Sequence, residues 1–187
     1  MAYEVVRPAE SEWEQLRELR LRALRDTPIA YGERYEEALR VGEDNWRARA
    51  ARSVSPGNVQ VVARLVDGDD AGLWVGSMAG FVSRGVPAYA TDGVVADPDA
   101  PPRANLVGVF VDPRVRGRET GVTDALLDAV VAWARDEQGL DRLYLHVHED
   151  NPRAAGYYRR RGFVATGASF PAVLHGGLEQ EMVLALA

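Results

Sequence analysis

Two hydrophobic periods alternate along this chain, and their order predicts its secondary structure. Apolar residues at helical spacing, three or four positions apart, predict four helices, at residues 10–25, 33–52, 121–138 and 152–161. Runs that are rich in β-branched residues or that alternate with polar residues predict seven strands, at residues 3–7, 59–66, 73–83, 104–111, 142–148, 163–168 and 179–186. We expect the order strand, two helices, three strands, helix, strand, helix and two strands.

This order predicts an α/β fold with a mixed sheet. A chain of 187 residues is long enough for one substantial core and short for two, so residues 1–187 are expected to form a single domain. Residues 84–103 differ from their surroundings because they contain four prolines and several aspartates. An irregular segment of that length inside a compact domain is typical of a functional or mobile loop.

Composition and charge exclude several kinds of site. The chain has 47% hydrophobic and 27% charged residues, as an ordinary globular protein has, and its net charge of −6 does not favour nucleic acid. The absence of cysteine excludes disulfides, thiolate metal sites and a cysteine nucleophile. The three histidines lack the spacing of a metal site. With no membrane-spanning apolar run and no signal peptide, no membrane partner and a cytoplasmic location are expected.

A turn rich in glycine and arginine joins the strand at residues 104–111 to the next helix. Its sequence, DPRVRGRETG, ends at Gly121, where the helix begins. Free N–H groups at a helix N-terminus attract anions, and glycine lets a phosphate approach the backbone. The turn lacks the Gly-Lys-Ser/Thr of a Walker A loop and the G-x-G-x-x-G of a dinucleotide site. From these residues alone, a phosphate site and an ordinary loop with solvated arginines both stay open.

A second motif follows the strand at residues 142–148. Residues 151–163 read NPRAAGYYRRRGF. Asn151 and Pro152 are residues that begin helices, and Gly162 is one that ends them. Each of these assignments is ordinary by itself, and the spacing of the whole segment is what carries information.

Together, the two motifs resemble those of the GNAT family of N-acetyltransferases. That family's second pattern, L-x-L-x-V-x-x-x-N-x-x-A-x-x-(L/F)-Y-x-x-x-G-F, is met from Leu143 to Phe163, with Tyr157 in the Leu/Phe position. Its first pattern, Q/R-x-x-G-x-G/A after V-x-P, departs by two extra residues, so either Arg116 or Arg118 leads it. The resemblance in motifs covers residues 106–163, and the order of elements agrees over the whole chain.

The resemblance implies a single-domain, mostly antiparallel mixed sheet flanked by helices, with splayed central strands, and acetyl-CoA as cosubstrate. The pantetheine arm would pair with the central strand, the turn would hold the pyrophosphate, and Tyr158 would be a general acid near the sulfur. The implied coenzyme-binding residues are Val109, Phe110, Val111, Arg116, Gly117, Arg118, Gly121, Val122, Thr123 and Asn151. Tyr158 could equally be a half-buried helix aromatic.

The implied reaction is direct transfer of acetyl from acetyl-CoA to a primary amine of a small molecule or peptide. Relatives place a glutamate on the central strand as base, where this chain has Asn105. Other residues near the implied cleft are His146, His148, Glu149, Asp150 and His175. Residues 19–32 are similar to a segment of bacterial members that lies over the acceptor side, with Tyr31 and Glu36 or Glu37 as cleft residues.

Two other functions fit the same residues. An inactive acyl-CoA-binding or regulatory module would keep the fold and lose turnover, as the altered turn and the absent glutamate allow. A generic α/β protein would bind some other phosphate ligand in the turn. The sequence does not determine the oligomeric state, although homodimers are frequent in the family that it resembles.

Overall fold

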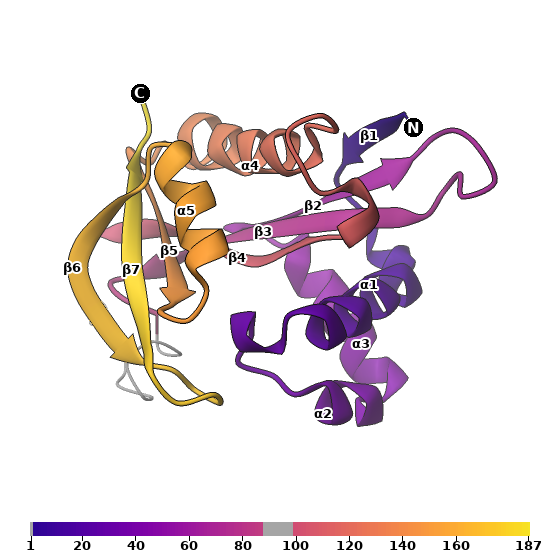
Figure 1. Ribbon diagram of the computed structural model, residues 1–187, viewed down its shortest axis with the longest axis horizontal. Coiled ribbons are helices and arrows are strands. Elements are labelled where there is room, and N and C mark those ends of the chain that lie inside the picture. The colour runs from indigo at the N-terminus through magenta and orange to yellow at the C-terminus, as the bar shows by residue number, and fades with distance from the viewer. Residues whose placement is uncertain (1, 88–98) are drawn as a thin grey trace.

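A mixed seven-stranded sheet, in the order β1-β2-β3-β4-β5-β7-β6, forms the centre of the computed structural model, which describes residues 2–87 and 99–187 (Figure 1). The strands are β1 (Tyr3–Val6), β2 (Asn58–Leu65), β3 (Trp74–Arg84), β4 (Pro102–Val111), β5 (Arg142–His148), β6 (Val164–Pro171) and β7 (Leu178–Ala185). Neighbouring strands are antiparallel except β4 and β5, which are parallel. The predicted fold class is confirmed.

The α-helices differ from the prediction at two places. They are α1 (Trp13–Asp26), α2 (Tyr35–Arg40), α3 (Glu43–Ser53), α4 (Val122–Ala132) and α5 (Pro152–Arg160). The single helix predicted at residues 33–52 was wrong, because Val41 and Gly42 adopt extended backbone angles and divide it into α2 and α3. The helix predicted at 121–138 ends as an α-helix at Ala132 and continues as a π-helical turn, Trp133–Glu137. Of the segment predicted to be irregular, residues 88–98 lie outside the described chain.

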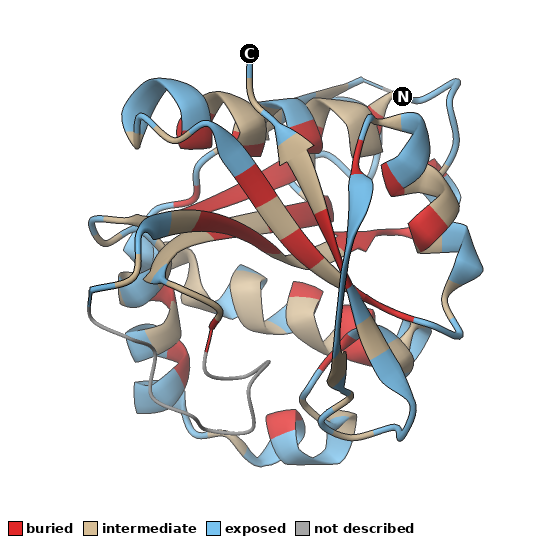
Figure 2. Ribbon diagram, turned by 90° about the vertical axis from the view of Figure 1, so that its left-hand side faces the viewer, coloured by how far each residue is buried: buried red, intermediate tan, exposed pale blue. Residues whose placement is uncertain are grey.

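Helices cover both faces of the sheet, with α4 and α5 on one side and α1 to α3 on the other (Figures 1 and 2). Successive residues of β2 show why, since Val61 faces the core under α4 and Val62 faces the core under α1 and α3. Each core contains a tryptophan that is 1% exposed, Trp133 on the α4 side and Trp46 on the other. The alternation of apolar residues along the strands therefore builds two cores.

The parallel strands β4 and β5 part after two residue pairs. Ala104 pairs with Leu143 and Asn105 with Tyr144, after which the strands diverge. Gly108, with φ of +62°, lies where the register between β3 and β4 shifts. Such a bulge bends a strand and increases its twist. The second half of β4 consequently has no strand partner on the side that faces β5.

Gly80 tests the packing of α4 against the sheet. A Cβ atom at this position of β3 would lie 2.6 Å from Cζ3 of Trp133 and 3.1 Å from Cγ1 of Val59. Gly80→Ala should therefore lower the free energy of unfolding by about 1–3 kcal/mol in urea denaturation, the usual cost of overpacking a core. In the control Gly156→Ala, the new Cβ meets only Arg160 Nη1, at 3.6 Å. That helix position should gain stability, and unchanged stability of Gly80→Ala would contradict the packing.

Candidate functional site

Side chains, not a strand, satisfy the free edge of β4. The Tyr31 hydroxyl donates to the Val109 carbonyl at 2.8 Å, and Arg116 Nε donates to the Val111 carbonyl at 2.6 Å. Arg116 also pairs with Asp26 at the end of α1. Because a buried carbonyl without a partner is costly, these contacts stabilise a strand edge that β5 has left. They also bring α1, the segment after α1 and the turn after β4 together at this strand edge.

Two buried tyrosines meet at the point where the strands part. Tyr31 is 7% exposed and Tyr158, on α5, is 6% exposed. Burial raises the pKa of Tyr31 to about 12. Burial, followed by the nearby Tyr31, raises the pKa of Tyr158 well above its ordinary value. Both hydroxyls are therefore protonated at neutral pH, so Tyr158 can donate a proton and is a poor base.

The buried carboxylate of Asp112 fixes the first part of the turn after β4. Asp112 accepts from the Arg114 N–H at 3.0 Å and pairs with Arg22 of α1 at 3.0 Å. Although burial opposes ionisation, the hydrogen bonds and charge of Arg114 and the charge of Arg22 lower the pKa of Asp112. Farther along, the Thr120 hydroxyl donates to the Val115 carbonyl at 2.6 Å. These contacts fix the path of the chain from β4 into α4.

The start of α4 has the properties of an anion site. Gly121, with φ of +69°, precedes the helix in a left-handed conformation that glycine adopts readily. The N–H groups of the first turn, from Val122 to Asp124, make no hydrogen bond to any described residue. A Cβ at Gly117 would meet nothing within 4 Å, so the backbone is open there. Helix N-termini of this kind bind phosphate groups.

The two arginines that could lead the turn have different roles. Arg116 is half-buried, donates a hydrogen bond to the Val111 carbonyl and forms an ion pair with Asp26. Arg118 is exposed and has no ion pair within the described ranges. Arg118 is therefore the arginine available to a phosphate, and Arg116 is a cap on the strand. Glu119, between Arg118 and Thr120, is exposed. The sequence alone had left the choice between the two arginines open.

Helix α5 is fastened to the start of α4. The Tyr157 hydroxyl donates to the Thr123 carbonyl at 3.1 Å and to Asp124 Oδ1 at 3.0 Å, and Arg161 pairs with Asp124 at 2.8 Å. Asn151 caps α5, since its side chain accepts from the Ala154 N–H at 3.1 Å. The structure thus places Asn151 beside the split sheet in a helix-capping role. Phe110 instead packs in the core under α1 and α3.

The histidines on β5 differ in their environments. His148, 4% exposed, accepts from the Asp150 N–H through Nδ1 at 3.1 Å, so its Nε2 donates to the Gly176 carbonyl at 2.7 Å. Its Nε2 thus contacts the β6–β7 loop and its Nδ1 the turn between β5 and α5, so neither nitrogen is free for catalysis. His146 instead lies 3.3 Å from Glu181 Oε2, through its Nε2, and its ring packs against Phe170.

Asn105, in the part of β4 where the family resemblance implies a glutamate base, belongs to a buried polar cluster. It is 1% exposed, accepts from Arg103 Nε at 3.2 Å and donates to Ser83 Oγ at 2.9 Å. Arg103 also pairs with Glu181 at 2.6 Å. Asn105 is thus a fixed connector within the sheet. Sequence reasoning missed Glu181, because alternation along β7 shows which face a residue occupies but not its partners.

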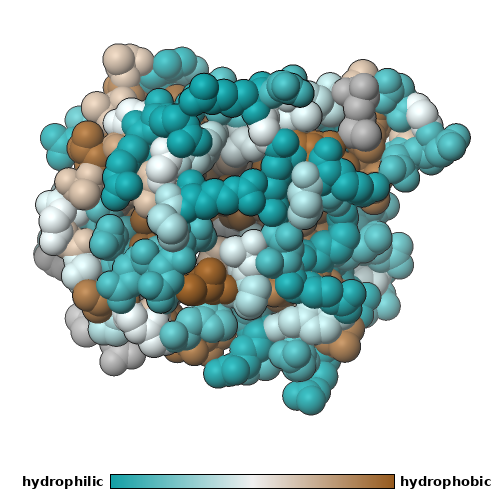
Figure 3. Space-filling model, in the orientation of Figure 1, coloured by the Kyte–Doolittle hydropathy of each residue, from teal (hydrophilic) through white to brown (hydrophobic). Residues whose placement is uncertain are grey.

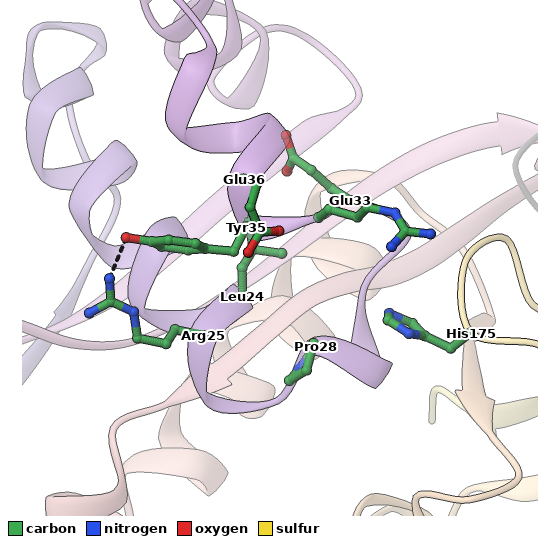
Figure 4. Close-up of a pocket in the computed structure, with 8 residues that line it drawn as sticks. Leu24, Arg25, Pro28, Glu33, Tyr35, Glu36 and His175 are labelled. Carbon is green, nitrogen blue, oxygen red and sulfur yellow. Dashed lines mark hydrogen bonds between the residues drawn. The ribbon is translucent and has the colours of Figure 1, made fainter.

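Two pockets open on the α1–α3 side of the sheet. The first, the His175 pocket, has a volume of about 440 Å³ and is lined by Leu24, Arg25, Pro28, Glu33, Arg34, Tyr35, Glu36 and His175. In Figure 4, His175 points from the β6–β7 loop toward the segment that follows α1. The structure therefore places His175 and Glu36 at one pocket, as expected, whereas Glu37 is not among its lining residues. The second, the Trp46 pocket, is lined by residues of α1, α3 and the sheet.

The face of the molecule shown in Figure 3 is mostly hydrophilic, with apolar side chains in small separate areas. No helix in the described ranges is long and apolar enough to cross a bilayer. The described residues also contain no group of three histidine, aspartate or glutamate side chains placed to hold a metal ion.

The chain is an α/β protein in which the central parallel strands part beside an open helix N-terminus, the kind of helix end that binds phosphate groups. The model of the Acetyltransferase (GNAT) family matches residues 13–163, and the chain belongs to this family. A mycothiol acetyltransferase from Salinispora arenicola is 38% identical over 71 residues, which are 38% of this chain and 22% of that protein. The chain thus matches only about a fifth of that relative's length.

Solved structures share the fold at low sequence identity. A GNAT acetyltransferase from Streptococcus pneumoniae superposes with a TM-score of 0.74 at 15% identity, covering 100% of both chains. A protein from Salmonella typhimurium, solved with its cofactor acetyl-CoA, gives 0.71 at 18% identity, covering 100% of this chain and 95% of that one. The fold assignment is therefore independent of the sequence motifs.

Replacing Arg118 tests the anion site. Arg118→Glu replaces a positive charge with a negative one near the start of α4, where the resemblance implies that the pyrophosphate of coenzyme A binds. A lost charge-assisted hydrogen bond is worth about 1.5–3 kcal/mol, so affinity measured by isothermal titration calorimetry should fall about tenfold or more. Arg40→Glu, an exposed arginine at the end of α2, is the matched charge-reversal control. Equal affinity of the two variants would contradict the assignment of Arg118.

Glu181 makes stability depend on pH. Although burial opposes its ionisation, hydrogen bonds from His146, Arg103 and Thr166 and the charge of Arg103 lower its pKa to about 2. A carboxylate with a lowered folded-state pKa stabilises the fold above its ordinary pKa of 4.5, and loses that contribution as pH falls toward 2. Urea unfolding between neutral pH and about pH 3 should therefore show a smaller loss of stability in Glu181→Gln than in the wild type. The same pH slope in both would exclude this role.

Proposed function

We propose that this protein transfers the acetyl group of acetyl-CoA directly to a primary amine of a small molecule or peptide. The single observation that carries the proposal is the free edge of β4, which lies between the open start of α4 and the protonated Tyr158. Family membership supports acetyl transfer in general, as does the curated relative that is a mycothiol acetyltransferase. That the acceptor is a primary amine is part of the proposal and does not follow from family membership.

The described residues fit the coenzyme in three places. The edge of β4 at Val109 and Val111 offers backbone groups to the amides of the pantetheine arm, once Tyr31 and Arg116 give up the two carbonyls. The first turn of α4 offers free N–H groups to the pyrophosphate. Arg118 adds a positive charge there. Acetyl-CoA supplies a thioester, whose carbonyl carbon the amine attacks.

The chain's own contribution to the chemistry is proton transfer and positioning. Tyr158 keeps its proton at neutral pH because burial raises its pKa, so it can protonate the departing sulfur. Because a thiol has an ordinary pKa of about 8.5, the thiolate of coenzyme A is a tolerable leaving group even before it is protonated. The contribution expected of Tyr158 as an acid is therefore moderate. Since the chain has no cysteine, direct transfer is simpler than passage through an acyl-enzyme.

We propose His146 as the group that accepts the amine's proton. Leu143, Leu145 and Val147 of β5 pack in the core on the α4 side, so the alternating His146 faces the side on which both pockets open. Glu181 lies beside it and orients the ring. His148 lies on the same face, but both of its nitrogens are occupied.

A second function, acyl-CoA binding without turnover, is favoured by one specific observation. The resemblance implies a glutamate base on the central strand, but the residue in that neighbourhood is Asn105, which is fixed in a buried cluster. Binding of coenzyme A without acetylation of any amine in a broad panel would support this alternative. Acetylation of any amine at a rate that depends on Tyr158 would support the transferase.

Tyr158→Phe separates catalysis from binding. The substitution removes the proton donor and leaves the packing against Phe163 intact. Turnover of a responsive amine should fall by about 10²-fold, while the affinity for coenzyme A is unchanged. Tyr157→Phe is the matched control, because it loses the bonds to Thr123 and Asp124 and should mainly lower stability. A Tyr158→Phe enzyme with wild-type turnover would remove the acid role.

A further inference from the structure

The Trp46 pocket lies between α1, α3 and the sheet, on the same side as the His175 pocket. Its volume is about 300 Å³, which suits part of a small molecule. It is lined by Leu16, Leu19, Arg20, Ala23, Glu33, Trp46, Arg49, Arg52, Ser53, Gln60, Ser77 and Gly108. Nothing in the proposed coenzyme site accounts for this hollow.

The charge of this pocket is opposite to that of the chain. Three arginines, Arg20, Arg49 and Arg52, and one carboxylate, Glu33, line it, whereas the chain as a whole carries −6. Glu33 pairs with Arg20 at 3.0 Å and with Arg49 at 2.8 Å. Burial opposes its ionisation, but the hydrogen bonds and charges of these arginines lower its pKa, so it is ionised. One carboxylate against three guanidinium groups leaves a net positive pocket.

Two of the three arginines, Arg20 and Arg49, are held in place by Glu33 and by aromatic rings. The Arg49 guanidinium lies 4.5 Å from the centre of the Trp46 ring, and the Arg20 guanidinium lies 4.5 Å from that of Tyr31. Arg52 is exposed and has no ion pair within the described ranges. A guanidinium presents paired N–H donors that match a carboxylate or phosphate. Arg52 is therefore free to meet an oxyanion at the pocket's rim.

A buried donor adds an independent observation. Trp46 is 1% exposed, and its Nε1 has no hydrogen-bond partner among the described residues. A buried N–H group without an acceptor is costly, and a ligand oxygen would relieve that cost. Ser77 and Gln60, both buried, also line the pocket. Ser77 already donates to the Gly108 carbonyl and Gln60 to the Met78 carbonyl, so Trp46 Nε1 is the neutral donor left unpaired among these three lining residues.

The pocket adjoins the strand edge on which the coenzyme is proposed to pair. Gly108, the bulged residue of β4, is one of its lining residues and precedes Val109, where the pantetheine arm is proposed to pair. A ligand that anchors an anionic group among the arginines can therefore direct another group toward the strand edge. That geometry suits an acceptor whose amine and anion are a few bonds apart.

We propose that the Trp46 pocket binds an oxyanion of the acceptor, so that the acceptor is a small amine that also carries a carboxylate or phosphate. This inference rests on the proposed function and names the substrate class. Arg52 supplies a positive charge that is not in an ion pair with any described residue. Arg20 and Arg49 together add a second, because Glu33 neutralises only one of their two charges. Trp46 Nε1 supplies the neutral donor.

Matched pairs of amines test the proposal. Phenylalanine is compared with phenethylamine for the carboxylate, and phosphoethanolamine with ethanolamine for the phosphate, using kcat/KM for acetyl transfer. The wild type should prefer the anionic member of at least one pair, and the pair that responds identifies the oxyanion. Arg52→Ala should lower that preference about tenfold or more, through KM. Arg47→Ala, on the same helix and paired with Glu43 outside the pocket, should keep it.

The outcomes distinguish failure of the oxyanion site from failure of the proposed function. Equal kcat/KM within both pairs, or a preference that survives Arg52→Ala, overturns the oxyanion site while leaving the acetyltransferase function intact. If no amine is acetylated although coenzyme A binds, the proposed function fails. The pocket is then tested by the melting temperature with N-acetylphenylalanine against N-acetylphenethylamine. Stabilisation by the acid alone, lost in Arg52→Ala, supports the site, and its absence overturns it.

Discussion

The parting of β4 and β5 is the constraint on which the rest of this site depends. Two residue pairs join the strands, and beyond them β4 keeps backbone groups that no strand satisfies. Because such groups need partners, Tyr31 and Arg116 reach them from elsewhere in the chain. Where the strands part, the sheet loses the hydrogen bonds between β4 and β5, and the exposed backbone groups can pair with a ligand that contains amides. Stability and proposed binding thus use the same backbone atoms.

Ion pairs around this opening matter for position more than for stability. Exposed pairs contribute little free energy, but here they connect elements that are far apart in sequence. Arg116 joins the turn to Asp26 of α1, and Arg161 joins α5 to Asp124 of α4. The turn is thereby linked to α1, and the helix that carries Tyr158 is linked to α4. A change at one of these links is expected to affect both coenzyme and acceptor.

Much of this could be predicted from sequence, and the remainder depends on contacts between distant residues. Periodicity identified the strands, and the segment from Leu143 to Phe163 identified the family, because helix caps and core positions recur at fixed spacing. The break at Gly42 was missed, since scattered apolar residues continue across it. The choice between Arg116 and Arg118 needed the position of Asp26. The coenzyme-binding and catalytic roles remain proposals, now tied to particular atoms.

The most direct test is an amide-resolved NMR titration of the protein with coenzyme A. The account predicts that the largest shifts fall on Val109, Val111 and the first turn of α4, and that amides of β1 change little. It also predicts that Tyr31 loses its bond to the Val109 carbonyl on binding, visible as a change at its hydroxyl proton. Saturable binding with shifts confined to other elements, or no binding at millimolar coenzyme, would contradict the account.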